Sequence, residues 1–134
     1  GCVLESIPDT LMQRLRDVIA QMPEWARGPL LDILNDSIVE RAHLWRDSLY
    51  DRVTHEFIEA DTHGAREPGY IPTIGWYNPN ATLHLHLSAW NTPADLKRIV
   101  CHEAVHLYWQ LGEDAEATSA WAEKVSACIE NRDQ

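Results

Sequence analysis

Apolar residues recur at helical spacing through most of the N-terminal half of the chain. Over residues 11–22 they lie three or four positions apart, and residues 6–9, Ser-Ile-Pro-Asp, have the pattern of a helix start. This predicts a first helix that ends at Pro23. Over residues 31–60 the apolar positions continue with steps of three or four, close to the helical repeat of about 3.6. The sequence therefore predicts a long second amphipathic helix, or two helices in line, that ends near Gly64.

The pattern changes to that of a β-strand in the second half. Residues 81–88 alternate strictly between apolar and polar side chains, and residues 78–80, Asn-Pro-Asn, are typical of a turn. With residues 70–77 as the first strand, the sequence predicts a β-hairpin. Pro72 cannot donate a ladder hydrogen bond, so we expect that first strand at an edge or with the amide position of Pro72 facing out of the sheet.

Two further helices are predicted after the hairpin. A helix-start pattern at residues 92–95 and a break at Gly112 bound the first of them, and the last helix begins at about Asp114. The chain of 134 residues fits one domain. We expect an α+β fold, mainly helical with a small antiparallel β-hairpin or sheet, in a single domain over 1–134 that divides into N-terminal helices over 1–65, the hairpin over 70–90 and the helices of a candidate site over 92–131.

The candidate site is the stretch CHEAVHL at residues 101–107, in which His102, Glu103 and His106 form the pattern His-Glu-x-x-His. Positions four apart share one face of a helix, so His102 and His106 can offer two ring nitrogens to one ion. Imidazole pairs suit zinc, which in catalytic sites takes three protein ligands and a water. Glu103 is placed to stand beside that water and to accept its proton as a general base.

With this motif, the C-terminal half resembles a compact zincin metallopeptidase of the gluzincin, minigluzincin-like kind. Residues 116–122, Glu-Ala-Thr-Ser-Ala-Trp-Ala, are similar to the small-residue context of that family's third ligand. The resemblance covers about residues 70–130 and implies a zincin-like fold, one zinc ion and hydrolysis of peptide bonds. It also implies His102, His106 and Glu116 as the metal ligands and Glu103 as the catalytic base.

The chain departs from the family pattern in three respects. Trp109 and Gly112 stand where the metzincin subfamily needs Gly and His, which excludes that subfamily. The gap between the motif and the third ligand is short, so Glu113 and Asp114 stay open as ligands in place of Glu116. No residue matches the family's transition-state-stabilising group plainly, and the candidates for that role are Tyr108 and His84.

Two other groups of histidines have the spacing of metal ligands. His84 and His86 share one face of the predicted strand, where they can bind a metal, point outward to solvent or border a substrate cleft. The resemblance favours the cleft, since that strand would be the edge with which an extended peptide pairs. His55, Glu59 and His63 would stack on one face of the long predicted helix, which is more typical of a solvated polar face than of a metal site.

The composition limits the classes of partner that we expect the protein to bind. The formal net charge is −10 at pH 7, and nucleic-acid binding depends on Lys and Arg, so we expect no nucleic-acid partner and a preference for basic peptides. No apolar run approaches the ~20 residues that span a bilayer. We therefore expect a soluble monomer without a membrane partner, acting on a peptide or protein substrate.

The cysteines bear on the compartment. Cys2, Cys101 and Cys128 are too few and too scattered for a disulfide framework, so we expect free thiols and slightly favour the cytoplasm. Because the chain begins with Gly rather than Met, a removed export signal stays open.

Two functions are compatible with these patterns. The first is a zinc-dependent peptidase in which Glu103 activates a water molecule. The alternative is a non-enzymatic helical protein-interaction module, whose metal site is structural or absent and whose long second helix binds a partner. Glu103 favours the peptidase, because a structural zinc site has no use for a base at that position.

Overall fold

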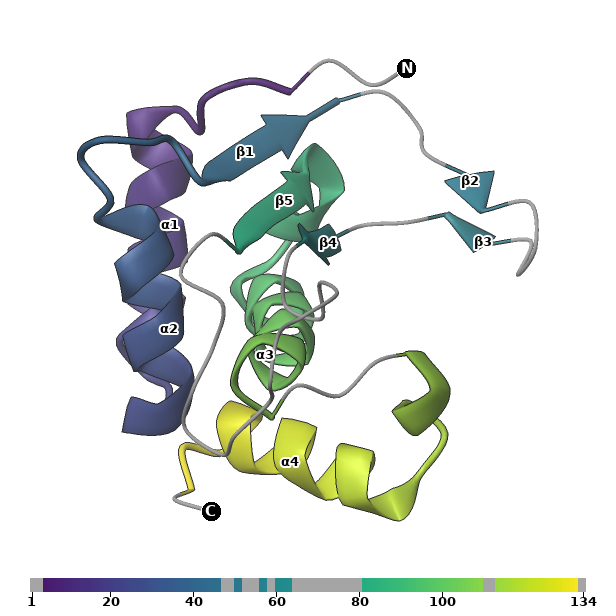
Figure 1. Ribbon diagram of the computed structural model, residues 1–134. Helices are drawn as coiled ribbons and strands as arrows, with labels where there is room; N and C mark the ends of the chain where they lie inside the picture. Colours follow the sequence, from purple (N-terminus) through teal and green to yellow (C-terminus); the bar gives the residue numbers. More distant parts are fainter. Residues whose placement is uncertain are drawn as a thin grey trace.

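The computed structural model describes residues 4–46, 50–51, 56–57, 60–63, 81–109 and 113–132. Its fold is α+β and mainly helical, as the sequence predicts (Figure 1). Within these residues no helix is long and apolar enough to cross a bilayer. The elements in chain order are α1 Asp9–Ile19, α2 Glu24–Leu34, β1 Ala42–Trp45, β2 Tyr50–Asp51, β3 Glu56–Phe57, β4 Ala60–His63, β5 Thr82–His86, the 3-10 turn η1 Leu87–Trp90, α3 Pro93–Trp109, the 3-10 turn η2 Glu113–Ala115 and α4 Ser119–Ile129.

The first helix begins slightly later than its sequence pattern indicates. Pro8 stands at the N-cap of α1, and no side chain caps the helix. The hydroxyl of Ser6, the expected cap, instead donates to a carboxylate oxygen of Glu40 at 2.6 Å. α1 then buries Leu15 and Ile19 in the core, as its spacing predicts.

The long second helix predicted over residues 31–60 is wrong beyond Leu34. The carboxylate of Asp36 accepts hydrogen bonds from the backbone amides of Ile38 and Val39, both at 2.9 Å. A side chain that binds nearby backbone amides offers the chain an alternative to the next helical turn. These amide bonds, and the nearby Arg41, hold the pKa of Asp36 below its usual value.

The chain then enters the sheet as β1. Arg41 is buried just before it, donates from Nε to the carbonyl oxygen of Ala81 at 2.9 Å and forms ion pairs with Asp32 and Asp36. Both Leu44 and Trp45 are buried although they are adjacent in the strand. A strand buried on both faces shows no polar alternation, which is why its apolar positions fitted a helical period.

A three-stranded sheet has the order β1-β5-β4, so β5 is its central strand. β5 pairs in parallel with β1, with Ala42 opposite Leu83, and antiparallel with β4, with Ala60 opposite Leu85. β2 and β3 form a separate antiparallel pair. The strand predicted over 81–88 is confirmed as β5, but the hairpin is wrong in its pairing, since both neighbours of β5 come from the segment predicted to be helical. The expected first strand, 70–77, lies outside the described residues.

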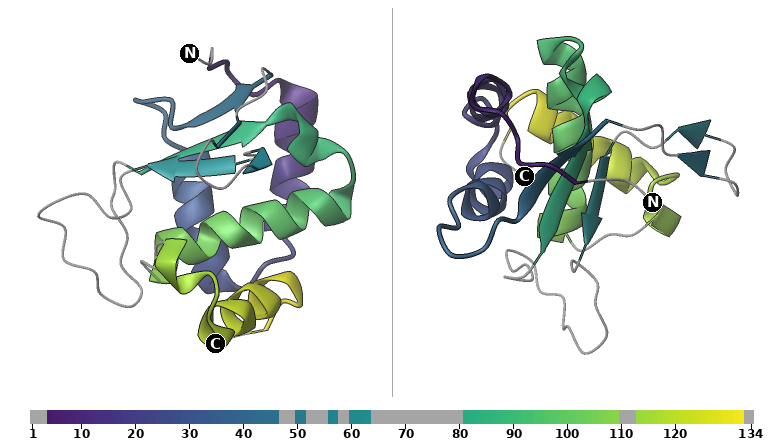
Figure 2. Two further views of the ribbon diagram at one scale, coloured as in Figure 1. Left: turned by 90° about the vertical axis from the view of Figure 1, so that its right-hand side faces the viewer. Right: turned by 90° about the horizontal axis from the view of Figure 1, so that it is seen from above.

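The helix α3 lies at the centre of the molecule. It packs against α1, α2, α4, η1 and β4. Figure 2 shows it lengthwise, with the sheet along one side and α4 along the other. Its fully buried side chains Val100, Ala104 and Leu107 share one core with Leu83 and Leu85 of β5. The helix that carries the motif is therefore fixed on several sides.

Candidate metal centre

His102 and His106 project from α3 one helical turn apart. Their Nε2 atoms are 3.3 Å apart and their ring centroids 5.0 Å apart. Both side chains are half-buried, whereas Val105, between them in sequence, is fully buried. The two imidazoles thus converge at the surface of α3.

Glu103 adds a carboxylate to this pair. One ligand atom each from His102, Glu103 and His106 lies within 4.8 Å of the other two, and Oε2 of Glu103 is 3.9 Å from Nε2 of His102. Only 4% of Glu103 is exposed. A carboxylate that is buried to this degree needs a compensating charge or hydrogen bonds. Buried ionisable groups of this kind are common at catalytic sites.

Glu116 reaches the same place from the other side. Its Oε1 atom lies 2.9 Å from Nε2 of His102. We expected Glu116 in the first turn of the last helix, and this position is wrong, because α4 begins only after Thr118. The Thr118 hydroxyl accepts a hydrogen bond from the amide of Trp121 at 3.2 Å and donates to the carbonyl oxygen of Ala115 at 2.7 Å, so Thr118 is the cap that ends the turn and starts α4.

The two competing ligands are less well supported. Asp114 is exposed in η2. The backbone of Glu113 also belongs to η2, but its side chain lies outside what the structure describes. For Glu116, in contrast, the described residues show a carboxylate oxygen beside a motif histidine, His102.

Trp121 is a neighbour of the site that the sequence did not indicate. Its ring centroid lies 4.9 Å from that of His102 and 4.7 Å from that of His106, and 5% of the residue is exposed. An aromatic residue at helical spacing is typical of a core, so its contact with the histidines needed the three-dimensional structure.

The electrostatic environment keeps His102 neutral. Burial, together with the positive charges of His106 and Arg98, lowers the pKa of His102 to about 4. A neutral imidazole is the form that binds a metal ion. At neutral pH the metal-free site therefore does not need to lose a proton from His102 before an ion enters.

Two distances between donor atoms, both measured from His102, are close to those around a zinc ion. Two ligands at ~2.0–2.1 Å from a tetrahedral zinc lie about 3.3–3.4 Å from each other. The Nε2 atoms of His102 and His106 are 3.3 Å apart, and the contact of 2.9 Å between Glu116 and His102 is slightly shorter than that separation. Two nitrogens and one carboxylate oxygen make a donor set that zinc accepts in catalytic sites.

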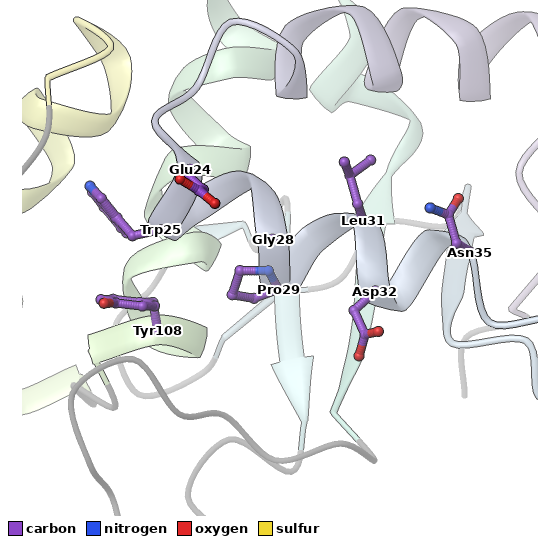
Figure 3. A pocket seen from close by; sticks show the side chains of 8 residues that line it. All are labelled: Glu24, Trp25, Gly28, Pro29, Leu31, Asp32, Asn35 and Tyr108. Atoms are coloured by element: carbon purple, nitrogen blue, oxygen red, sulfur yellow. The ribbon is translucent and has the colours of Figure 1, made fainter.

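Tyr108 does not belong to this site. It lies two positions after His106, about 200° around the helix. It lines a cavity of about 430 Å³ with residues of α2, and its ring centroid is 5.3 Å from that of Trp25 (Figure 3). The proposal of Tyr108 as a transition-state-stabilising group is therefore wrong. Figure 3 shows Tyr108 and Trp25 at one end of the cavity, with Asn35 at the other.

The histidines of β5 also point away from α3. Leu83 and Leu85 are buried in the core that α3 shares, so the alternating residues His84 and His86 face the opposite side of the sheet. The ring of His84 lies 5.2 Å from that of His43, its register partner on β1. This excludes His84 as a group that reaches the substrate beside Glu103, and β5, as a central strand, is not the edge expected to pair with a peptide.

The third histidine group is lost with the long helix. His63 belongs to β4, so the helical stacking expected for it does not form. Its expected companions, His55 and Glu59, lie outside the described residues.

A disulfide joins the two helices of the site. Cys101, the neighbour of His102 on α3, is bonded to Cys128 of α4, and their Cα atoms are 5.7 Å apart. Both residues are fully buried. The prediction of free thiols is wrong for this pair, because the packing of α4 against α3 brings together cysteines that are 27 positions apart in sequence.

Comparison of the chain with protein-family models, with curated protein sequences and with solved structures finds no match.

Proposed function

We propose that the protein is a zinc-dependent metallopeptidase that hydrolyses peptide bonds. The observation that carries this proposal is that one ligand atom each from His102, Glu103 and His106 lies within 4.8 Å of the other two, while Oε1 of Glu116, from a second segment, lies 2.9 Å from Nε2 of His102. A buried carboxylate beside a two-histidine, one-carboxylate donor set is the arrangement that activates water for hydrolysis. The resemblance to minigluzincin-like zincins supports the same reaction.

The roles of the residues follow from their positions. His102, His106 and Glu116 would hold the zinc ion. When bound, zinc supplies a lowered pKa for its water and polarises the substrate carbonyl. Glu103, almost fully buried next to His102, accepts the proton of the attacking water and passes it to the leaving amine. Burial of Glu103 excludes solvent, so the proton has few competing acceptors.

The sheet offers a place for an extended peptide. β4 is the last strand of the three-stranded sheet among the described residues, and it packs on α3. A peptide that adds to a sheet edge by main-chain hydrogen bonds would align with β4 and so lie along the helix that carries the motif. The net charge of −10 favours peptides with basic residues.

The alternative function loses its main feature. A non-enzymatic interaction module was suggested by a long second helix that could serve a partner. In the structure α2 is 11 residues long, and the chain then continues into the sheet.

The direct test compares the parent with Glu103→Gln. The amide retains the size of the side chain but cannot accept the water's proton. We expect the variant to bind one equivalent of zinc like the parent and to cleave a mixed peptide library about 100-fold to 10,000-fold more slowly. Zinc content is measured by elemental analysis after purification without chelator. A parent that binds no zinc, or a variant that cleaves as fast as the parent, would contradict the proposed function.

A further inference from the structure

Three aromatic rings at the proposed metal centre form a closed triangle. The centroids of His102 and His106 are 5.0 Å apart, and the centroid of Trp121 lies 4.9 Å and 4.7 Å from them. The ring planes of His102 and Trp121 meet at 71°, and those of His106 and Trp121 at 53°. Edge-to-face and tilted contacts at these distances are the favourable arrangements of aromatic pairs.

This triangle restricts the rotation of each imidazole. A histidine ring can turn about its last side-chain torsion only if the space beside it allows the turn. Trp121 fills the space beside both rings and is itself 5% exposed. On that side, the indole and the other imidazole restrict the rotation of each histidine ring.

Trp121 is in turn held by its own helix. Its backbone amide is bonded to the cap residue Thr118, and the disulfide between Cys128 and Cys101 fastens the following turns of α4 to α3. The indole thus has a firm support, and it belongs to the same segment that delivers Glu116. An indole held in this way can restrict the motion of the two imidazoles beside it.

We propose that Trp121 is a positioning residue, which holds the imidazoles of His102 and His106 in the orientation in which both Nε2 atoms bind one metal ion. This inference rests on the proposed function, since it assigns the support of the same metal centre. Trp121 would support two of the proposed ligands without donating an atom to the metal itself. Hydrogen-bonded partners of metal-binding histidines change metal affinity by about 10-fold to 100-fold when they are mutated, and we expect an effect at the lower end of that range for Trp121.

The test uses two large apolar replacements that differ in shape. Trp121→Phe retains a flat ring against the histidines, whereas Trp121→Leu retains apolar volume without a ring. We expect Trp121→Leu to bind zinc at least about 10-fold more weakly than the parent, and Trp121→Phe to stay much closer to the parent. Affinity is measured by competition with a chromogenic chelator. Equal affinity of the two variants would overturn the proposal.

A second measurement does not depend on the leucine variant being folded. Bound Co²⁺ quenches the fluorescence of an indole in contact with its ligands. We expect Co²⁺ to quench part of the parent's fluorescence and to lose most of that effect in Trp121→Phe, with Trp90→Phe as the matched control. Trp90 is also buried, but its indole donates to the carbonyl oxygen of Leu11, away from the metal centre. Undiminished quenching in Trp121→Phe would place the indole away from the metal and overturn the proposal.

The two proposals fail in different ways. A parent that takes up neither zinc nor Co²⁺ contradicts the metallopeptidase itself. A parent that binds both, with variants of Trp121 that behave like it, contradicts only the positioning role.

Discussion

Two pairs of histidines meet almost equally closely in this molecule. The rings of His102 and His106 on α3 are 5.0 Å apart, and those of His43 and His84 on the sheet are 5.2 Å apart. The sheet pair even has a carboxylate nearby, because Nε2 of His43 is 3.3 Å from an oxygen of Glu40. Yet among the described residues only the α3 pair belongs to a group of three donors that could hold a metal ion.

The difference lies in what surrounds each pair. Glu40 is 55% exposed and comes from the chain just before β1. At the α3 pair, Glu103 is buried in the same helix, and Glu116 arrives from a second segment. Close histidines are therefore not sufficient for a metal site. A dry carboxylate and a ligand from another element distinguish the candidate centre from a pair of neighbouring rings.

The strongest test of this comparison removes each pair of histidines. We expect the double variant His102→Ala, His106→Ala to lose stoichiometric zinc binding and peptide hydrolysis completely, since two of the three proposed ligands are gone. The matched variant His43→Ala, His84→Ala should retain one equivalent of zinc. Isothermal titration with zinc measures the number of zinc ions that each variant binds. Loss of zinc from the sheet variant would show that the two pairs were ranked in the wrong order.

The next test concerns the ligand from the second segment. Glu116→Ala should weaken zinc binding by at least about 10-fold, which is ~1.4 kcal/mol, because its oxygen is the one found beside His102. Asp114→Ala and Glu113→Ala should stay close to the parent. A chelator-competition titration of the three variants ranks them. A larger loss in either control than in Glu116→Ala would move the ligand into the turn η2.

A smaller effect, on the stability of the folded state, is expected when the metal-free protein is acidified. His102 takes up a proton at a pKa of about 4 in the fold, and in the unfolded chain near its ordinary value of ~6.5. Between these values the unfolded state binds more protons, so the folded state loses stability as pH falls from ~6.5 to ~4. The effect is modest because His102 is 36% exposed. Melting temperatures measured across this range with a chelator should fall more steeply for the parent than for His102→Gln, and parallel curves would contradict the burial of this imidazole.

The smallest effect is expected at Tyr108. Its ring packs on Trp25 in the α2 cavity, on the far side of α3 from the histidines. Tyr108→Phe should therefore leave the cleavage rate close to that of the parent. Peptide cleavage by the purified variant checks this. A loss comparable with that of Glu103→Gln would return Tyr108 to the chemistry and would require a different arrangement of α3.

The helix that carries the motif could be predicted because its signals are local. Thr92 accepts a hydrogen bond from the amide of Asp95 at 3.0 Å, as the helix-start pattern indicates. The motif lies in one helix, so the spacing of His102 and His106 fixed their common face. The alternation of residues 81–88 likewise predicted β5. In each case the information is contained in a few neighbouring residues.

The remaining features depend on contacts between distant residues. The end of α2 is determined by the amide bonds of Asp36 and by buried Arg41, which pairs with Asp32 across the turn. Neither contact changes the apolar spacing of the segment, which was therefore compatible with a helix. Trp121 had the pattern of a core residue, and nothing in its local sequence shows that its neighbours are histidines. Glu116 was found by resemblance, while its true location depends on the cap Thr118.

The disulfide also affects the thermally denatured chain. Cys101 and Cys128 close a covalent ring, and His102, Glu103, His106 and Glu116 all lie inside it. When the core melts without reduction, the four side chains stay confined to this ring, and we expect the denatured ensemble to retain some affinity for metal. Because binding to the denatured state subtracts from the stabilisation that a ligand gives the folded one, zinc should raise the melting temperature less than its affinity for the native protein implies. Because the disulfide keeps the four donors close together, we also expect them to bind a metal ion again early on cooling, before the fold has re-formed.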